Sequence, residues 1–205
     1  MYIVFDLETT GLPERARKVS GSEYYSPSML DKYEKARIVQ IAYIGINHNF
    51  DKICQGEYKV KNVDLLDSTK YHGITYDILE REGISFDNIV EEIKEHFTDC
   101  EGFIAHNAEF DMNILCSELI RRQYIEFANV LYNKQLICSM KTFMNNVGIH
   151  NKYGIKYPSL TELYKFTFGQ DTIIDNAHDA MVDTLALVEC LKEIKLQKDI
   201  NILDL

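Results

Sequence analysis

The chain has 205 residues, of which 46% are hydrophobic and 26% charged, a balance typical of a globular domain with a substantial core. No apolar run approaches the roughly 18 residues of a membrane span, and the N-terminus reaches Asp6 without a basic region, which argues against a signal peptide. The net charge of −10 argues against a protein that coats long nucleic acids, so a nucleic-acid partner is expected to be gripped at a few terminal nucleotides.

The five cysteines are widely spaced and odd in number. This pattern argues against a disulfide framework and against a cysteine zinc site, and it predicts reduced, mostly buried thiols. We therefore expect an intracellular protein of a reducing compartment, the cytoplasm or the nucleus, that is not secreted.

The first part of the chain predicts three strands. Residues 2–6 are apolar on both faces, which is typical of a central strand, and residues 38–47 and 51–60 form the next two. Between the first two strands, residues 13–37 are polar and rich in tyrosine. We interpret this segment as a long insertion with a functional role or high mobility.

The remainder predicts helices alternating with a short strand. Apolar residues 102–105 form a buried strand that leads directly into a helix. Asp87 is placed to cap one helix, and Ser159-Leu-Thr-Glu162 has the pattern of a capping box. The expected helices are 87–98, 108–122, 159–168 and 179–197, the last with Leu185, Val188, Leu191 and Ile194 along one side. Together these elements predict a single α/β domain over residues 1–205, with a mixed β-sheet and flanking helices.

Two carboxylates, Asp6 and Glu8, lie at the end of the first predicted strand. Residues i and i+2 of a strand point to the same face, so these acids repel each other unless a cation lies between them. Taken alone, the pair also fits an ordinary polar strand end. Gly11 follows and permits the chain to turn sharply away from the sheet.

Two further polar clusters follow along the chain. In His106-Asn107-Ala108-Glu109-Phe110-Asp111, Asn107 is predicted to cap a helix, and Asp111 lies in its first turn, where a carboxylate suits the helix dipole. Asp183 lies among apolar residues of the last helix, where a buried aspartate needs a partner such as a metal. His178 stands at the entry of that helix, and a neutral imidazole there could accept a proton from water.

Together the three clusters resemble the motifs of the DEDD exonuclease superfamily, which includes the proofreading subunit of bacterial DNA polymerase III and RNase T. The first motif matches as Phe5-Asp6-Leu7-Glu8-Thr9-Thr10-Gly11-Leu12, the second as His106-Asn107-Ala108-Glu109-Phe110-Asp111, and the third as His178 with Asp183 five residues later. The motifs occur in the order seen in the superfamily and span residues 5–183. His178 makes the chain similar to the histidine branch, DEDDh.

The resemblance implies an RNase H-like fold and a metal-dependent 3′→5′ exonuclease that releases nucleoside monophosphates from a single-stranded or frayed 3′ end of DNA or RNA. It implies two divalent cations, Mg²⁺ or Mn²⁺, because oxygen ligands and a phosphate substrate favour these ions over zinc. By resemblance, the metal ligands are Asp6, Glu8, Asp111 and Asp183, the general base is His178, and the substrate-binding residues are Thr9, Leu12 and Asn107.

Two loops carry further signals. His72-Gly73-Ile74-Thr75 resembles a loop near the active site of several superfamily members, and it also fits a surface turn. Within residues 13–37, cations and aromatic rings occur together, a combination that suits a single strand held upstream of the cleaved end. The alternative is that these tyrosines pack on the sheet edge. The side chains concerned are Arg15, Arg17, Lys18, Tyr24, Tyr25 and Tyr33.

Two other functions compete with a long-strand exonuclease. An oligoribonuclease or small-nucleotide phosphodiesterase would use the same residues, and the acidic net charge favours it slightly. A catalytically inactive nucleic-acid-binding module is disfavoured, because all four acids and the histidine are present. The sequence leaves open the choice between DNA and RNA, between monomer and homodimer, and whether a polymerase is a partner.

Overall fold

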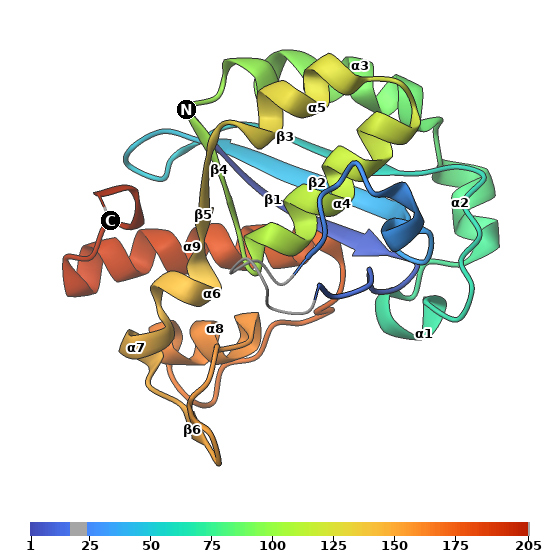
Figure 1. Ribbon diagram of the computed structural model, residues 1–205. Coiled ribbons are helices and arrows are strands. Elements are labelled where there is room, and N and C mark those ends of the chain that lie inside the picture. Colours follow the sequence, from blue (N-terminus) through green and yellow to red (C-terminus); the bar gives the residue numbers. More distant parts are fainter. Residues whose placement is uncertain (17–23, 205) are drawn as a thin grey trace.

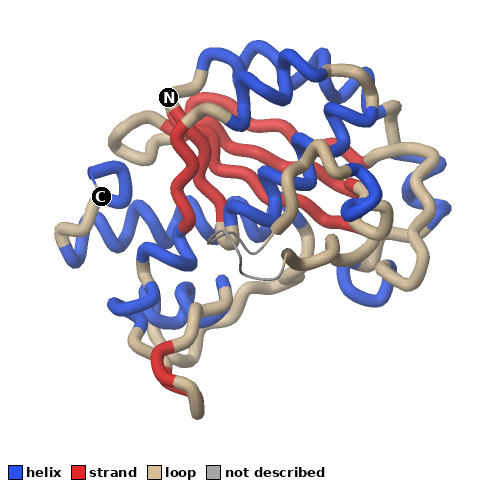
Figure 2. The backbone as a smooth tube through the Cα atoms, viewed as in Figure 1, coloured by secondary structure: helices blue, strands red, loops and turns tan. Residues whose placement is uncertain are grey.

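The computed structural model describes residues 1–16 and 24–204, and its central element is a five-stranded sheet (Figure 2). The strands are β1 (Tyr2–Thr9), β2 (Ile38–Ile46), β3 (Lys52–Lys59), β4 (Gly102–Ala105) and β5 (Gln135–Cys138). They lie in the order β3-β2-β1-β4-β5, so β1 is the middle strand, as its apolar faces predict. β1, β2 and β3 pair antiparallel, whereas β1, β4 and β5 pair parallel. The predicted mixed sheet is therefore confirmed, although β5 was not among the predicted strands.

Helices cover both faces of the sheet (Figure 1). They are α1 (Thr69–His72), α2 (Tyr76–Glu82), α3 (Phe86–Asp99), α4 (Ala108–Arg121), α5 (Ile125–Tyr132), α6 (Ser139–Thr142), α7 (Met144–Val147), α8 (Leu160–Phe168) and α9 (Ala180–Lys198). Two short 3₁₀ helices, η1 (Leu30–Tyr33) and η2 (Ile202–Asp204), and a small hairpin of β6 (His150–Asn151) and β7 (Gly154–Ile155) complete the described fold.

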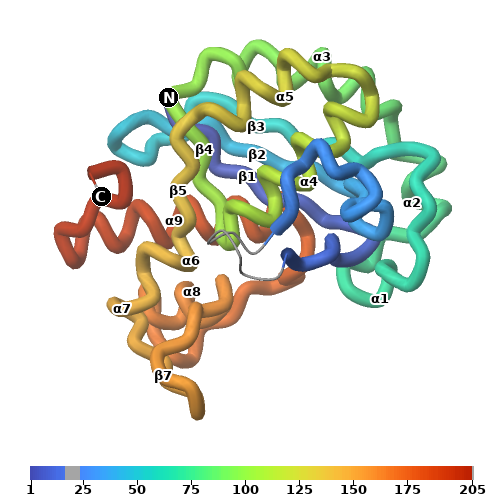
Figure 3. Tube along the Cα trace, viewed as in Figure 1, coloured from blue at the N-terminus to red at the C-terminus, as the bar shows by residue number. Residues whose placement is uncertain are grey.

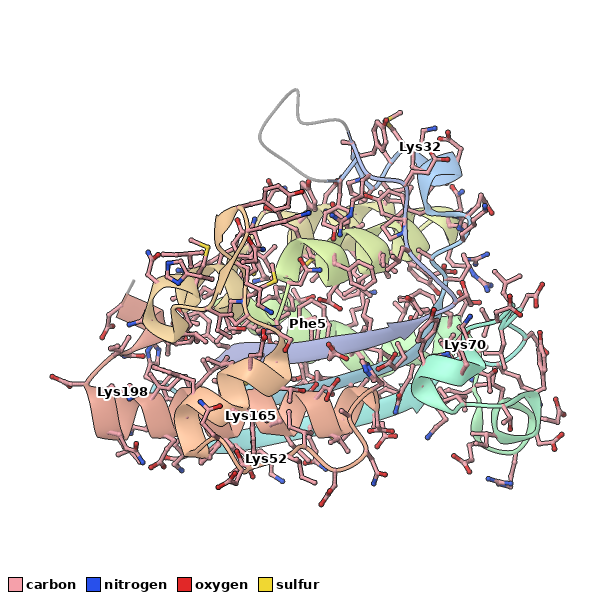
Figure 4. All side chains as sticks on the ribbon, turned by 90° about the horizontal axis from the view of Figure 1, so that it is seen from below. Phe5, Lys32, Lys52, Lys70, Lys165 and Lys198 are labelled. Carbon is pink, nitrogen blue, oxygen red and sulfur yellow. The ribbon has the colours of Figure 1, made fainter. Side chains whose placement is uncertain are left out.

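The alternation of side chains along β1 joins two separate cores. Ile3, Phe5 and Leu7 pack with residues of α3, α4 and α5, whereas Tyr2 and Val4 pack with residues of α8 and α9. Figure 1 shows α3 and α5 on one side of the sheet and α9 on the other. Seen from below in Figure 4, Phe5 lies at the centre of the molecule and the labelled lysines lie at its periphery. Every position on β1 therefore faces one helical layer or the other.

The segment between β1 and β2 passes beside α4, where η1 contacts that helix (Figure 3). Tyr24 is buried with its ring edge-on to Phe110, and the buried Tyr33 donates its hydroxyl proton to the carbonyl oxygen of Tyr25. These two tyrosines are therefore packed as the alternative expects, although Tyr24 lies against α4 and not on the sheet edge. Neither ring presents a face on which a base could stack. Arg17 and Lys18, which the strand-binding hypothesis uses, lie outside the described residues.

Local capping signals predicted one helix start correctly and another wrongly. Ser159 and Glu162 form the expected reciprocal capping box at the start of α8. At α3, by contrast, the cap is Ser85, whose side chain accepts the backbone N–H of Asn88 at 3.2 Å. Asp87 lies instead in the first turn, because the buried Phe86 begins the helix before it. An acid in that turn still interacts favourably with the helix dipole.

The predicted inward side of α9 is confirmed for three of its four residues. Leu191 and Ile194 are buried and Val188 packs against the same core, whereas Leu185 is 41% exposed and Leu187 and Cys190 are buried. Within the part of the chain that the structure describes, α9 and the other helices do not combine the length and apolar character of a membrane span.

Candidate active site

Asp6 and Glu8 continue the series of β1 side chains that faces α9. Asp6 lies opposite Ala42 of β2, and Glu8 lies opposite Gln40. Both carboxylates are half-buried, and they come from the middle strand of the sheet. The expectation that the two acids share a face is therefore confirmed, and they lie where water screens their repulsion poorly.

The first turn of α9 brings His178 and Asp183 to these acids. Asp179 caps the helix, and its Oδ1 accepts two backbone N–H groups of the first turn, each at 3.1 Å. His178, just before it, adopts a left-handed backbone with φ 73°, and its N–H donates to Asp183 Oδ2 at 3.2 Å. As a result, ligand-capable atoms of Glu8, His178 and Asp183 lie within 4.8 Å of one another.

Asp111 approaches the same site from the first turn of α4. The helix follows β4, the parallel neighbour of β1, so its N-terminus lies beside the end of β1 that carries the acids. Asp111 is only 2% exposed. After burial itself, repulsion from Asp6 is the largest cause of the raised pKa of Asp111, so the two carboxylates lie near each other. The structure therefore gathers all four predicted acids and His178 around one end of β1.

Asn107 does not cap α4, so that prediction is wrong. Its backbone is left-handed, with φ 79°, and its side chain makes no capping bond. Instead, the amide Nδ2 donates to the Tyr24 hydroxyl at 3.4 Å. Asparagine tolerates this backbone better than most residues, which gives the chain its turn from β4 into α4.

The other two predicted substrate-binding residues lie in the turn after β1. Thr9 is half-buried, and its hydroxyl donates to Gly11 O at 2.9 Å. Leu12 is 72% exposed, so its side chain is accessible to a ligand. A Cβ on Gly11 would lie 2.7 Å from the carbonyl oxygen of Lys35, so close approach of the chain explains this glycine better than an unusual φ does.

His106 of the second motif has a structural role. Its Nε2 lies 2.9 Å from the carbonyl oxygen of Pro158, so this nitrogen must carry the proton and donate it. The Nδ1 atom lies 3.0 Å from the hydroxyl of Ser139. Burial lowers the pKa of His106, which favours the neutral ring. His106 thereby ties the start of α4 to the segment that precedes α8.

The carboxylates of the site repel one another, and this repulsion adds to the effect of burial on their pKa values. Burial, with repulsion from Asp183 and Asp179, raises the pKa of Asp6 to about 8. Burial followed by repulsion from Asp6 raises the pKa of Glu8 to about 9. Burial also raises the pKa of Asp111 and of Asp183 above the ordinary range. Asp6 and Glu8 therefore hold protons at neutral pH unless another cation replaces them.

The residues present fit a divalent cation. Asp183 Oδ1 is buried and has no hydrogen-bond partner among the described residues, which costs about 1–3 kcal/mol or more unless a ligand satisfies it. Carboxylate oxygens form a hard donor set that suits Mg²⁺ or Mn²⁺ better than a thiophilic metal.

A comparison with protein families matches residues 3–191 to the exonuclease family RNase_T, and the match spans all three motifs. The chain belongs to the RNase_T exonuclease family. The resemblance inferred from the motifs is thereby confirmed. No curated protein matches the chain significantly.

Solved exonuclease structures share the fold. A structure of exonuclease I matches with a TM-score of 0.69 and 18% identity over 99% of this chain and 42% of that one. E. coli exonuclease I in complex with a dT13 oligonucleotide matches with a TM-score of 0.70 and 18% identity over 97% of this chain and 41% of that one. Exonuclease X in complex with 5′ overhanging duplex DNA matches with a TM-score of 0.57 and 20% identity over 98% of this chain and 95% of that one. The chain thus spans about two-fifths of the exonuclease I chains, and the likeness confirms the RNase H-like fold.

Two residues of this exonuclease site, Gln40 and Asp179, were not predicted from the sequence. Gln40 is completely buried, and its Nε2 donates to Glu57 Oε1 at 2.9 Å and to Asp179 Oδ2 at 3.2 Å. Its Oε1 accepts the N–H of Ala180 at 3.2 Å. Gln40 therefore fixes the start of α9 against β2, next to Glu8. A lone amide in the apolar strand 38–46 was the signal that could have identified it.

We expect Gln40→Leu to lower activity through the position of α9. The change removes all three hydrogen bonds and leaves polar groups unpaired, so the free energy of unfolding should fall by about 1–3 kcal/mol. The Mg²⁺ concentration that gives half-maximal activity should also rise, because His178 and Asp183 lose their fixed place. Gln55→Leu, on the exposed part of β3, is the matched control. A loss of stability with an unchanged Mg²⁺ requirement would restrict Gln40 to a structural role.

The raised pKa values of Asp6 and Glu8 predict an unusual pH dependence of stability. The folded protein without metal keeps protons that the unfolded chain releases above about pH 4. The contribution of these two groups to the free energy of unfolding is therefore largest near pH 4, and it is lost as the pH rises towards 8 to 9. In chelator, the Tm should fall between about pH 5 and 9, and Asp6→Asn should flatten this slope. A slope unchanged in the variant would contradict the assignment.

A pocket of about 570 Å³ opens beside His178. His72 and Gly73, at the end of α1, line it together with His178 and Asp179. The expectation that the His72 loop lies near the active site is confirmed for these two residues. The pocket provides space beside His178 for part of a ligand.

Proposed function

We propose that this protein is a metal-dependent 3′→5′ exonuclease that hydrolyses phosphodiester bonds at the 3′ end of DNA or RNA and releases nucleoside monophosphates. The observation that carries the proposal is that ligand-capable atoms of Glu8, His178 and Asp183 lie within 4.8 Å of one another, close to the half-buried Asp6. Membership of the RNase_T exonuclease family supports it.

The site residues have distinct roles in this proposal. Asp6, Glu8 and Asp183 would hold one divalent cation, and Asp6 with Asp111 would hold a second. Two such cations, Mg²⁺ or Mn²⁺, supply when bound the positive charge that stabilises the attacking and leaving oxygens at phosphorus. His178 is exposed at the mouth of the site, where its ring can take the proton of the attacking water.

Thr9, Leu12 and Asn107 are the proposed contacts of the 3′-terminal nucleotide. Leu12 offers an exposed apolar side chain for a base, and Thr9 keeps an oxygen that can accept a hydrogen bond. Asn107 places an amide at the start of α4, four residues before Asp111. A single-stranded or frayed end suits this arrangement, because the acids lie below the surface and must be reached by an unpaired terminus.

End-labelled substrates test the proposed function directly. Purified protein with Mg²⁺ is incubated with single-stranded DNA, single-stranded RNA and a duplex with a mismatched 3′ end. We expect 5′-labelled strands to shorten one nucleotide at a time and 3′-labelled strands to release a labelled mononucleotide at once. Chelator should stop both reactions. Internal cleavage, or degradation from the 5′ end, would refute the proposed direction.

The net charge of −10 favours a second candidate, an oligoribonuclease or small-nucleotide phosphodiesterase. Such an enzyme needs little of the basic surface that attracts a long strand. The ratio of kcat/KM for a dinucleotide to that for a strand of 20 nucleotides separates the two. A ratio well above one favours the second candidate.

A further inference from the structure

The stretch from residue 127 to residue 161 has a charge opposite to that of the whole chain. It contains no aspartate or glutamate, although the chain has 32 acidic residues, and it contains four lysines. These are Lys134, Lys141, Lys152 and Lys156. Three of them are engaged within the fold, since Lys141 pairs with Glu109, Lys156 pairs with Glu162, and Lys134 donates to the carbonyl oxygen of Cys100. Lys152 and Lys156 lie in a single projecting element.

That element is the β6–β7 hairpin, which we call the hairpin arm (residues 148–157). It projects beyond α8, on the side of the sheet that carries α9 (Figure 1). His150 pairs with Ile155 and Asn151 with Gly154, so Lys152 and Tyr153 form the turn at its tip. Tyr153 is 85% exposed, and Lys152 Nζ lies 4.8 Å from the centroid of its ring.

The geometry of the turn does not require these two side chains. In the hairpin arm, positive φ angles occur at Gly148 and at Gly154, which follows the turn with φ 118°. Lys152 and Tyr153 themselves have ordinary negative φ angles, so the backbone of the turn does not select these residue types. Folding does not require them either, because Tyr153, Ile155 and Tyr157 are 85%, 44% and 44% exposed. Clustered exposed aromatic groups beside a cation are what a nucleic-acid strand binds.

The base of the hairpin arm is hydrogen-bonded to the second motif. Pro158, which follows the arm, accepts a hydrogen bond from His106 at 2.9 Å, and His106 precedes Asn107 in the second motif. The five residues from Tyr153 to Pro158 reach roughly 15 Å when extended. At about 3.4 Å for each stacked nucleotide, that length corresponds to about four nucleotides of a strand.

We propose that the hairpin arm binds single-stranded nucleic acid a few nucleotides upstream of the bond that is cleaved. Tyr153 stacks on a base and Lys152 neutralises a phosphate, while Lys156 stays paired with Glu162 at 2.6 Å. The inference rests on the proposed exonuclease function, because the hairpin arm would bind the upstream nucleotides of the strand that the active site cleaves. In the segment 13–37, by contrast, Tyr24 and Tyr33 are buried.

Two measurements test the hairpin arm. Binding of 5′-fluorescein oligo-dT and oligo-U, each of 12 nucleotides, is followed by anisotropy in chelator, and hydrolysis of the same strands and of a dinucleotide is followed in Mg²⁺. The variants are Lys152→Ala, Tyr153→Ala and the double change, with Lys152→Arg and Tyr153→Phe as conservative replacements. The matched control is Lys94→Ala with Tyr132→Ala, which removes the same groups from α3 and α5 on the opposite side of the sheet.

For the double change we expect Kd and KM on the 12-nucleotide strands to rise at least about fivefold, as loss of one stacked base implies. The slope of log Kd against log salt should fall by about 0.7, the contribution of one phosphate contact. Dinucleotide hydrolysis should keep its kcat and KM, and the conservative replacements and the control should resemble the wild type. A preference between oligo-dT and oligo-U would identify the natural strand.

Unchanged Kd, KM and salt slope in the double change would overturn the role of the hairpin arm while leaving the exonuclease function intact. A wild type that hydrolyses no substrate would instead refute the proposed function. In that case the anisotropy measurements still decide whether the hairpin arm binds a strand.

Discussion

Replacing Asp6 or Asp183 by asparagine is expected to abolish hydrolysis without unfolding the protein. Each change removes one charge from a set of buried carboxylates whose pKa values are raised by burial and mutual repulsion. The metal-free protein should therefore keep its Tm or gain a few degrees at pH 8, because an uncompensated buried charge is lost. Stabilisation by Mg²⁺ should shrink, since a ligand is missing.

The matched control is Asp51→Asn, which changes an exposed aspartate that lies in the turn just before β3 and pairs with Lys192. Its turnover should equal that of the wild type. Near-normal turnover in Asp6→Asn or Asp183→Asn would show that the assignment of metal ligands is wrong. A large fall in Tm without metal would show that these acids stabilise the fold instead.

His178→Ala should lower kcat by about 10²–10⁴-fold, the usual contribution of a positioned base. The affinity for Mg²⁺, measured by the shift of Tm with metal concentration, should change much less. His178 can be replaced with little effect on folding, because its side chain is exposed and the bond to Asp183 comes from its backbone N–H. Alanine keeps that N–H.

A ring nitrogen of His178 also lies within 4.8 Å of carboxylate oxygens of Glu8 and Asp183. The variant therefore distinguishes a general base from a metal ligand. Equal losses of rate and of Mg²⁺ affinity would make His178 a metal ligand, and full activity would remove it from the site. His48→Ala serves as control, since that histidine is exposed in the turn between β2 and β3 and pairs with Glu101.

Much of the candidate site was predictable because its signals are local. Asp6 and Glu8 share a face by the period of two in a strand, and His178 and Asp183 meet because a helix begins between them. The capping box at Ser159 likewise depends only on residues three apart. The order and spacing of these motifs carried the family assignment, which the match over residues 3–191 confirms.

Other features depended on contacts between distant segments. Asn107 looks like a helix cap, but a left-handed backbone turns its amide towards Tyr24, a residue 83 positions earlier. Gln40 reaches Asp179 across 139 positions and orients the helix that carries His178 and Asp183. Tyr24 and Tyr33 look suited to bind bases, yet they pack against the body of the protein.

The sequence by itself determined which residues supply the chemistry and on which face of its own strand or helix each one lies. Only the tertiary structure decided how those elements meet, which polar groups pair between them, and which aromatic rings remain exposed. The physical reason is that periodicity and capping arise within a few residues, whereas burial and hydrogen bonding between β2, α4 and α9 depend on how the whole chain packs.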